Sequence, residues 1–345
     1  MRVLTEAETR ELVTTADAYR IVEAAYLAYG EERTVLARPP GATMLVPHEP
    51  PTIVILKGAM LASQGIVGTR YAMQFGNYYC FVSDSRTNRL LGVVEESWLF
   101  RHRVGVTAGV AARWLAPPDV RTIGLIGAGL LNTEACIALA HDFPDARFRV
   151  NARRPERARS FAERLGSRTG AAVTSVATAR EAVEDADIVV AITLAEQPMI
   201  EPGMLKRGTL MLSMGGVEEV TFDCLPEFDR IVVDDPDYAF VRGDFAAWVA
   251  AGHIERTALE ARIDADIGEI ACGTKAGRRD DGETILAVIQ GMACFDIALS
   301  KHAIDEANRR GTGTWVESIA ASPGHAPPEN RRLVRTPYPT LVVDD

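Results

Sequence analysis

The sequence has no long apolar run and no basic, apolar leader. It contains no stretch of about 18 uncharged apolar residues, the length that a membrane helix needs. A secretory signal begins with basic residues and continues with an apolar run. The first residues here, MRVLTEAETRELV, carry charges of both signs and contain no such run. We therefore expect a soluble, cytoplasmic protein without a membrane partner.

Cysteine and histidine are scarce and follow no ligand pattern. The five cysteines include no CxxC pair, and the six histidines show neither HxxxH nor HExxH spacing. Disulfide frameworks and zinc sites depend on such spacings. We predict reduced, mostly buried cysteines and no metal site.

Basic residues are outnumbered by acidic ones. The chain has 37 Lys and Arg against 47 Asp and Glu, a formal net charge of −10 at pH 7. A negative field of this size repels phosphate backbones and acidic membrane surfaces. Nucleic acid is therefore not an expected partner.

Two kinds of pattern divide the 345 residues. Residues 5–30 have helical periodicity, with Thr14, Thr15 and Asp17 as cap signals between two helices. Short β-like runs follow, up to a helix over 98–116 that two prolines end. From residue 122, apolar strands alternate with amphipathic helices, as in a parallel sheet covered on both faces.

These patterns predict an α/β protein with a Rossmann-type doubly wound parallel sheet and a second, α+β domain. We assign residues 1–117 and about 290–345 to the α+β domain and residues 118–289 to the Rossmann domain. A helix over 285–310 is expected to return the chain to the first domain. The tail after Gly311 is predicted to be mostly irregular.

The stretch TIGLIGAGLLN indicates a dinucleotide site. Gly127 and Gly129 lie where a strand turns into a helix, as a tight turn that approaches a pyrophosphate requires. The third position of the fingerprint is Asn132 instead of glycine or alanine, so the motif alone is weak. The strand before it, the helix after it and a second strand about 20 residues on strengthen it. The expected cofactor-binding residues are Gly127, Gly129, Leu130, Leu131, Asn151, Arg153, Arg154, Thr193, Met214 and Gly215.

The end of the second strand favours NADP(H) over NAD(H). Asn151 is followed by Arg153 and Arg154, with no acidic residue until Glu156. A carboxylate there would accept from a ribose 2′-hydroxyl, whereas arginine suits a 2′-phosphate. The alternative is that these arginines form the solvated start of a helix.

The order of several segments resembles the ornithine cyclodeaminase/mu-crystallin family over most of the chain. The segments are LFRHRVGVTAGVAARWLA, GLIGAG, RRPERARSFA, ADIVVAIT, LSMGGVEEV and a late GxAxxD helix. The family pattern LTxxRTAAxSALAAxxLA registers without a gap on Leu99, Arg103, Ala108, Ala111, Ala112, Leu115 and Ala116. Phe100, Val104 and Gly105 depart from it, so the chain resembles a divergent member.

The resemblance implies that arginines hold a substrate carboxylate. The family's carboxylate-binding positions fall on Arg38, Arg70 and Arg103, with Arg70 where the family usually has lysine. Lys57 is a further candidate because its apolar neighbours indicate burial. The alternatives are that Arg38 is an exposed loop residue, that Arg70 is a strand-edge cation, and that Arg103 pairs with Glu95 or Glu96.

The resemblance fails at the catalytic acid of cyclodeaminases. Their aspartate after two glycines corresponds to Val217 here, which can neither accept a proton nor bind an ammonium group. Glu218 or Glu219 could replace it, and Glu218 is the first candidate. We therefore favour reduction of a C=N bond over ring-closing deamination.

The resulting prediction is an NADP(H)-dependent imine reductase or amino acid dehydrogenase, with Arg70, Arg103 and Glu218 as catalytic candidates. Arg38, Lys57, Arg70, Arg103 and Val217 are expected to contact a small carboxylated imine or amino acid. An ornithine- or lysine-type cyclodeaminase is one alternative. A non-catalytic NADPH-binding protein of the mu-crystallin type is another. The resemblance also implies a homodimer formed through the first domain.

Overall fold

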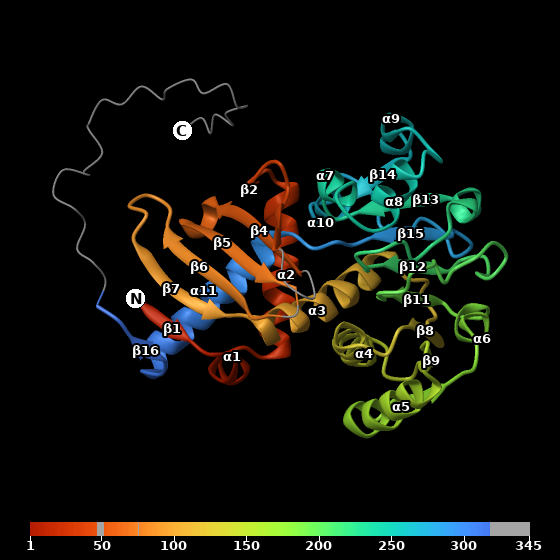
Figure 1. Ribbon diagram of the computed structural model, residues 1–345, viewed down its shortest axis with the longest axis horizontal. Helices are drawn as coiled ribbons and strands as arrows, with labels where there is room; N and C mark the ends of the chain where they lie inside the picture. The colour runs from red at the N-terminus through yellow and green to blue at the C-terminus, as the bar shows by residue number, and fades with distance from the viewer. Residues whose placement is uncertain (47–51, 75, 318–345) are drawn as a thin grey trace.

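The computed structural model describes residues 1–46, 52–74 and 76–317. Within these ranges the chain forms two eight-stranded sheets, on opposite sides of the long helix α3 (Ser97–Leu115) (Figure 1). No helix in these ranges combines the length and the apolar character needed to cross a bilayer.

The first sheet is mixed and has the order β16-β1-β7-β6-β5-β4-β2, with β3 paired to β4. Its strands are β1 (Arg2–Leu4), β2 (Thr34–Leu36), β3 (Ala42–Val46), β4 (Thr52–Leu61), β5 (Ile66–Met73), β6 (Tyr78–Asp84), β7 (Leu90–Glu95) and β16 (Thr314–Trp315). Buried and less buried residues alternate along β5, so the sheet has a core face and an open face. Helix α11 (Ala293–Arg310) packs against β4 to β7 on the core face.

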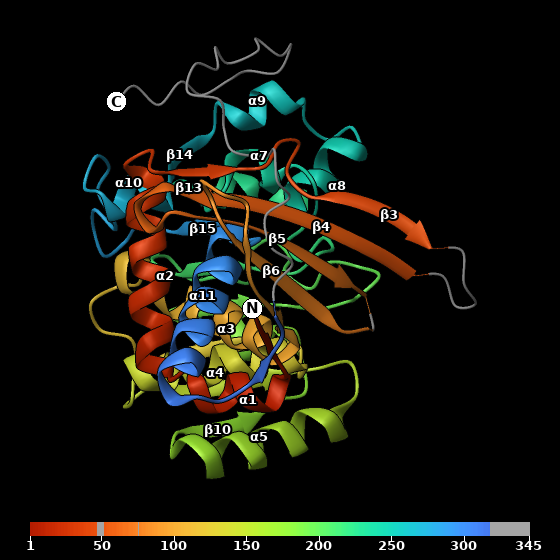
Figure 2. The same cartoon turned by 90° about the vertical axis from the view of Figure 1, so that its left-hand side faces the viewer.

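The two N-terminal helices begin where their cap residues predict. Helices α1 (Glu6–Leu12) and α2 (Thr15–Gly30) each start with a capping box, formed by Thr5 with Glu8 and by Thr14 with Asp17. This confirms the predicted cap signals between two helices. Figure 2 shows α2 and α11 side by side, and the two helices are in contact.

The second sheet is parallel throughout and has the order β10-β9-β8-β11-β12-β15-β13-β14. Its strands are β8 (Thr122–Ile126), β9 (Arg147–Asn151), β10 (Ala172–Ser175), β11 (Ile188–Ala191), β12 (Leu210–Ser213), β13 (Arg230–Val233), β14 (Ile263–Asp266) and β15 (Ile285–Val288). Its helices and 3-10 turn are α4 (Leu130–Asp142), α5 (Pro155–Thr169), α6 (Ala179–Val183), η2 (Phe222–Glu227), α7 (Pro236–Ala239), α8 (Asp244–Ala250), α9 (Arg256–Glu260) and α10 (Ile267–Ala271). The doubly wound α/β fold is therefore confirmed.

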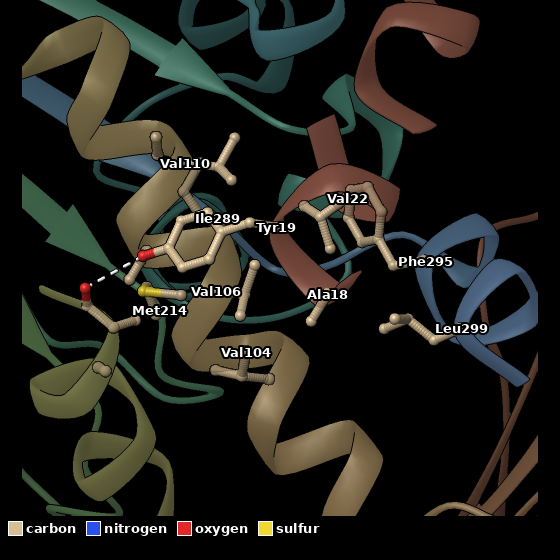
Figure 3. Packing of buried hydrophobic residues seen from close by; sticks show 14 of the residues in the cluster. Ala18, Tyr19, Val22, Val104, Val106, Val110, Met214, Ile289, Phe295 and Leu299 are labelled. Atoms are coloured by element: carbon tan, nitrogen blue, oxygen red, sulfur yellow. Dashed lines mark hydrogen bonds between the residues drawn. The ribbon is translucent and has the colours of Figure 1, made fainter. Parts of the chain in front are cut away.

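Both faces of this sheet are covered, as continuous apolar strands predict. Along β11, Ile188 and Val190 belong to one hydrophobic core, and Val189 and Ala191 belong to the other. The first core is continuous with the packing between the two sheets. Figure 3 shows side chains of α2, α3 and α11 converging there with residues that follow β12 and β15.

The predicted helix over 285–310 is wrong in its first part. Residues Ile285–Val288 form the buried strand β15 between β12 and β13, and the helix begins only at Ala293. Gly291, at φ +82°, separates the two elements. Short apolar runs do not distinguish a buried strand from a buried helix, which explains the error.

The described part of the tail after Gly311 contains a short strand. Thr314 and Trp315 pair with β1 as the edge strand β16. The apolar TLVV segment near the end lies outside the described residues. The predicted division into domains 1–117 with about 290–345, and 118–289, stays a prediction.

Helix α3 is packed closely enough against its neighbours that glycine is required at Gly105. A Cβ there would overlap the backbone carbonyl of Glu134 in α4. We predict that Gly105→Ala lowers the free energy of unfolding by about 1–3 kcal/mol, because the two helices must separate. Urea unfolding measures the change.

Gly166→Ala in α5 is the matched control. Its Cβ would lie 3.5 Å from the carbonyl oxygen of Ala171, an ordinary contact. Helix propensity should then raise the free energy of unfolding by up to about 1 kcal/mol. Equal effects of the two substitutions would show that the α3–α4 contact is not tight.

Candidate functional site

The turn between β8 and α4 has the geometry of a phosphate site. Gly127 has φ +101°, and a Cβ there would lie 2.6 Å from the carbonyl oxygen of Ile192. Gly129 is the N-cap of α4, and nothing lies within 4 Å of the position its Cβ would take. The N–H groups of Leu130 and Leu131 open the helix, where intrahelical acceptors are absent. This cradle fits the pyrophosphate of a dinucleotide.

Asn132 holds the glycine turn together, a role that the sequence analysis missed. Its buried side-chain amide donates to the carbonyl oxygens of Ile126, at 2.7 Å, and Gly127, at 2.8 Å. The departure from the usual third glycine is therefore a hydrogen-bonded brace. The tendency of asparagine to bond nearby backbone groups was the available signal.

Strand β9, the second strand of the Rossmann domain, ends beside this turn, and Arg153 and Arg154 follow the strand. The N–H of Gly127 donates to the carbonyl oxygen of Asn151 at 2.8 Å. The Asn151 amide donates in turn to the carbonyls of Val176 and Ala177, so its donors are used within the protein. Arg153 and Arg154 are exposed and form no ion pair within the described ranges.

Two exposed leucines flank the carboxyl edge of the second sheet. Leu130 is 66% exposed and Leu194 is 70% exposed. Large apolar side chains left open after two neighbouring strands of one sheet are typical of a surface that a ligand covers. Met214, by contrast, packs its side chain into the core shown in Figure 3, so only its backbone is available to a cofactor.

Glu219, rather than Glu218, lies against the predicted cofactor residues. Its carboxylate accepts from the backbone N–H of Thr193 at 2.6 Å and from the Thr193 hydroxyl at 2.8 Å. It also fills the space that a side chain at Gly215 would need. Glu218 instead accepts from the indole N–H of Trp248 at 3.0 Å. Burial raises the pKa of Glu219 to about 7.

Lys57, Arg70 and Arg103 meet in one buried cluster. Lys57 and Arg70 are direct cross-strand partners in β4 and β5, and Arg103 reaches them from α3. Each of the three is between 2% and 8% exposed. Arg70 is therefore not an exposed strand-edge cation.

Two carboxylates pair with the arginines of this cluster. Arg70 Nε donates to Glu96, and Arg103 Nε donates to Asp296 of α11 at 2.8 Å. The alternative that Arg103 pairs with Glu95 or Glu96 is wrong, because Arg103 pairs with Asp296, while Glu96 pairs with Arg70 and Glu95 accepts from Ser97. The GxAxxD motif by itself does not identify Asp296 as the partner of Arg103. Arg70 Nη2 has no hydrogen-bond acceptor in the described part of the chain.

Lys57 forms no ion pair with a carboxylate in the part of the chain that the structure describes. Its Nζ donates to the carbonyl oxygen of Gly291 at 2.8 Å and lies 3.2 Å from the ring centroid of Tyr238. Burial, and then the charges of Arg103 and Arg70, lower the pKa of Lys57 well below its ordinary value. Arg70 and Arg103 each pair with a carboxylate, whereas Lys57 interacts with the buried carboxylate of Asp234 only through space, so an anion bound beside Lys57 would favour its charged form.

Arg38 lies at the mouth of the same region. It lines a small hollow together with Lys57 and Tyr238. Its guanidinium donates to both carboxylate oxygens of Asp235, at 2.9 Å and 3.0 Å, and its side chain is 37% exposed. The guanidinium of Arg38 is therefore already paired with a carboxylate. It has fewer N–H groups free for a ligand than the guanidinium of Arg70, whose Nη2 has no acceptor in the described residues.

The loop after β12 connects the cluster to the dinucleotide edge. Gln290, next to Gly291, donates from its side-chain amide to the carbonyl oxygen of Gly215 at 2.9 Å. Val217, two residues after Gly215 in the loop that follows β12, is half-buried. The loops after β12 and β15 thus lie between the two predicted sets of residues. Gly291, after β15, contacts Lys57 of the predicted substrate site, and Gln290 contacts Gly215 of the predicted cofactor site.

Comparisons with known proteins match most of the chain. The model of the ornithine cyclodeaminase/mu-crystallin family matches residues 69–311. A Delta(1)-pyrroline-2-carboxylate reductase of Bacillus cereus is 26% identical over 331 residues, with 92% of this chain and 100% of the relative covered.

Two solved structures share the fold. Thermococcus litoralis Delta(1)-pyrroline-2-carboxylate reductase in complex with NADH and L-proline has a TM-score of 0.84 at 24% identity, covering 92% of this chain and 100% of that one. An archaeal alanine dehydrogenase dimer with bound NAD has a TM-score of 0.84 at 23% identity, covering 92% and 99%.

The raised pKa of Glu219 makes stability depend on pH. The folded chain keeps this proton up to about pH 7, whereas an unfolded glutamate releases it near 4.5. The resulting stabilisation is complete below the unfolded pKa and is lost as pH rises through the folded pKa, by up to about 3 kcal/mol. We predict that Glu219→Gln reduces this loss in urea unfolding measured between about pH 5 and pH 8.

Glu201→Gln, at an exposed side chain, controls for the removal of one carboxylate. It should retain the pH dependence of the unsubstituted chain. An unchanged dependence in Glu219→Gln would mean that Glu219 is already ionised in the folded protein.

Proposed function

Because the chain belongs to the ornithine cyclodeaminase/mu-crystallin family, we propose that it is an oxidoreductase that reduces the C=N bond of a small carboxylated imine with a nicotinamide dinucleotide. Interconversion of an amino acid with its imino or keto acid is the same chemistry in either direction. The observation that carries the proposal is the buried cation cluster, in which Lys57, Arg70 and Arg103 face two carboxylates. A substrate carboxylate would give Lys57 an anionic hydrogen-bond partner, which its contact with the Gly291 carbonyl does not supply.

The residues of the cluster orient the substrate. When bound, the reduced nicotinamide supplies a hydride to the imine carbon and becomes oxidised, while the iminium nitrogen keeps its own proton. Lys57 and Arg70 Nη2 hold the carboxylate attached to that carbon, with Arg103 adding positive charge. Fixing the carboxylate fixes the reacting carbon, which lowers the entropic cost of reaching the reactive geometry.

Val217 supports reduction over cyclodeamination. It presents an apolar wall where cyclodeaminases are expected to carry an aspartate, and Glu218 is engaged by Trp248. The B. cereus relative is named as a reductase of Delta(1)-pyrroline-2-carboxylate, a carboxylated cyclic imine. Imine reduction needs no second amine site, so it is compatible with valine at this position.

NADP(H) remains our proposed cofactor. The solved structures of similar fold contain NADH or NAD. Here no carboxylate comes between the end of β9 and Glu156, the Asn151 amide donates to the carbonyls of Val176 and Ala177, and Arg153 and Arg154 are exposed after the strand that ends beside the glycine turn. An exposed pair of guanidinium groups supports recognition of a 2′-phosphate.

A cytoplasmic homodimer is also proposed. The archaeal alanine dehydrogenase of similar fold is described as a dimer. Tyr71 and Phe81 are exposed on the first sheet, on the face opposite α11, which supports association through this face. In this arrangement the first domain holds the substrate and the partner subunit, and the second holds the dinucleotide.

Lys57→Met tests the proposed substrate site. We expect the unsubstituted chain to oxidise NADPH with Delta(1)-pyrroline-2-carboxylate. The variant should raise KM by about 10- to 100-fold, because a charged hydrogen bond to the carboxylate is lost. Its stability should change by no more than about 1 kcal/mol, because a buried cation without a carboxylate partner is replaced by an apolar side chain of similar size.

Lys275→Met, at an exposed lysine, is the matched control and should leave KM unchanged. Incubation with ornithine and catalytic NAD(P)+ should release no ammonia. Ammonia with proline as product would favour the cyclodeaminase instead. NADPH binding without oxidation of NADPH by any imine would favour a non-catalytic binding protein.

Replacing both Arg153 and Arg154 with serine tests the cofactor assignment. The double variant should lose roughly 10- to 100-fold in kcat/KM for NADPH, with little change for NADH, because the 2′-phosphate loses its guanidinium partners. Arg168→Ser, in the last turn of α5, the helix that begins directly after Arg154, is the control. Preference for NADH in the unsubstituted chain would contradict the assignment.

A further inference from the structure

Arg242 is a half-buried arginine without a carboxylate partner in the described ranges. It differs in this from Arg38, Arg70 and Arg103, each of which is paired. It follows α7 and precedes Gly243, the N-cap of α8, whose φ of +76° sets the turn. A guanidinium that is partly removed from water and lacks an anion is a candidate for ligand binding.

The guanidinium of Arg242 lies directly over Gly216. A Cβ at Gly216 would overlap its terminal nitrogen and would lie 2.8 Å from its Nε. Glycine at this position therefore makes room for the arginine. Arg242 thus covers the residue immediately before Val217, the position where a cyclodeaminase would place its acid.

A short path of contacts leads from Arg242 to the carboxylate site. Gly215, next to Gly216, accepts from Gln290, and Gly291 accepts from Lys57. A Cβ at Gly291 would overlap the Arg103 guanidinium, so that arginine also lies against the same loop. Arg242 and the cation cluster therefore border the same pair of loops. The positive charge of Arg242 also helps to lower the pKa of Lys57, after burial and the charges of Arg103 and Arg70.

The dinucleotide phosphates do not account for Arg242. The phosphate turn follows β8, and the sheet order places β11 between β8 and β12. Gly216 follows β12, so Arg242 lies two strands away from the turn. A substrate group is the better candidate for its partner.

We propose, on the basis of the imine reductase function above, that Arg242 binds a second carboxylate at the far end of the substrate. The substrate class is then a short dicarboxylic imine, of the kind that forms from a 2-oxo diacid and ammonia. The cation cluster holds the carboxylate next to the C=N bond, and Arg242 holds the distal one. The same charge repels the side-chain ammonium of ornithine or lysine, which disfavours diamino acids.

Arg242→Gln tests this assignment. The assay compares NADPH oxidation with 2-oxoglutarate plus ammonia against 2-oxobutyrate plus ammonia, which differ in the distal carboxylate. The unsubstituted chain should prefer the diacid by at least about 10-fold in kcat/KM. The variant should lose most of that preference while its activity with the monoacid changes by less than about twofold.

Arg256→Gln is the matched control, because Arg256 is a nearby arginine already paired with Glu260. It should retain the preference for the diacid. Calorimetry measures the binding of amino acids to the complex of the protein with NADP+, and this measurement does not depend on turnover. Arg242→Gln should weaken binding of L-glutamate by about 10-fold and leave binding of L-2-aminobutyrate unchanged.

The outcomes separate the two proposals. If the unsubstituted chain reduces Delta(1)-pyrroline-2-carboxylate but does not prefer the diacid, only the role of Arg242 is overturned. The same holds if Arg242→Gln weakens mono- and diacids equally. If no imine is reduced with either nicotinamide cofactor, the reductase function itself is overturned.

Discussion

The burial of three cations in one place is the constraint on which the rest of the structure depends. Lys57, Arg70 and Arg103 come from two strands and a helix, and removing like charges from water together is costly unless anions accompany them. Glu96 and Asp296 provide two of these anions. Lys57 is the cation of the cluster that lacks a carboxylate partner among the described residues, and its pKa is lowered by burial and by the neighbouring arginines. In the proposed function, a carboxylated substrate stabilises the charged form of Lys57.

In the proposed function, the second sheet brings the electron donor to this cluster. Its carboxyl edge carries the turn at Gly127, braced by Asn132, and the buried helix α3 connects the two sheets. The loops after β12 and β15 then join the dinucleotide edge to the cations, through Gly215 and Gly291. Hydride transfer needs both reactants held within a near-attack geometry, and this shared pair of loops provides a rigid frame for it.

Local signals made much of the fold predictable, and tertiary contacts explain most of the rest. The capping box at Thr14, the glycine turn and the alternation of strands with helices each depend on residues close in sequence. Strand β15 was mistaken for helix because its apolar run is short and buried. The pairing of Arg103 with Asp296 joins residues 193 positions apart, and no local pattern encodes it. The candidate site was thus predictable in its cations but not in the carboxylates that hold them.

The central claim is that the cation cluster is a carboxylate site beside a bound dinucleotide. A crystal structure with NADPH and pyrrole-2-carboxylate, a planar analogue of a cyclic imino acid, tests it most directly. The account predicts the ligand carboxylate within hydrogen-bond distance of Lys57 Nζ and Arg70 Nη2, with its ring facing the nicotinamide. A carboxylate bound elsewhere, with Lys57 still held by Gly291 and no anion at the cluster, would contradict it.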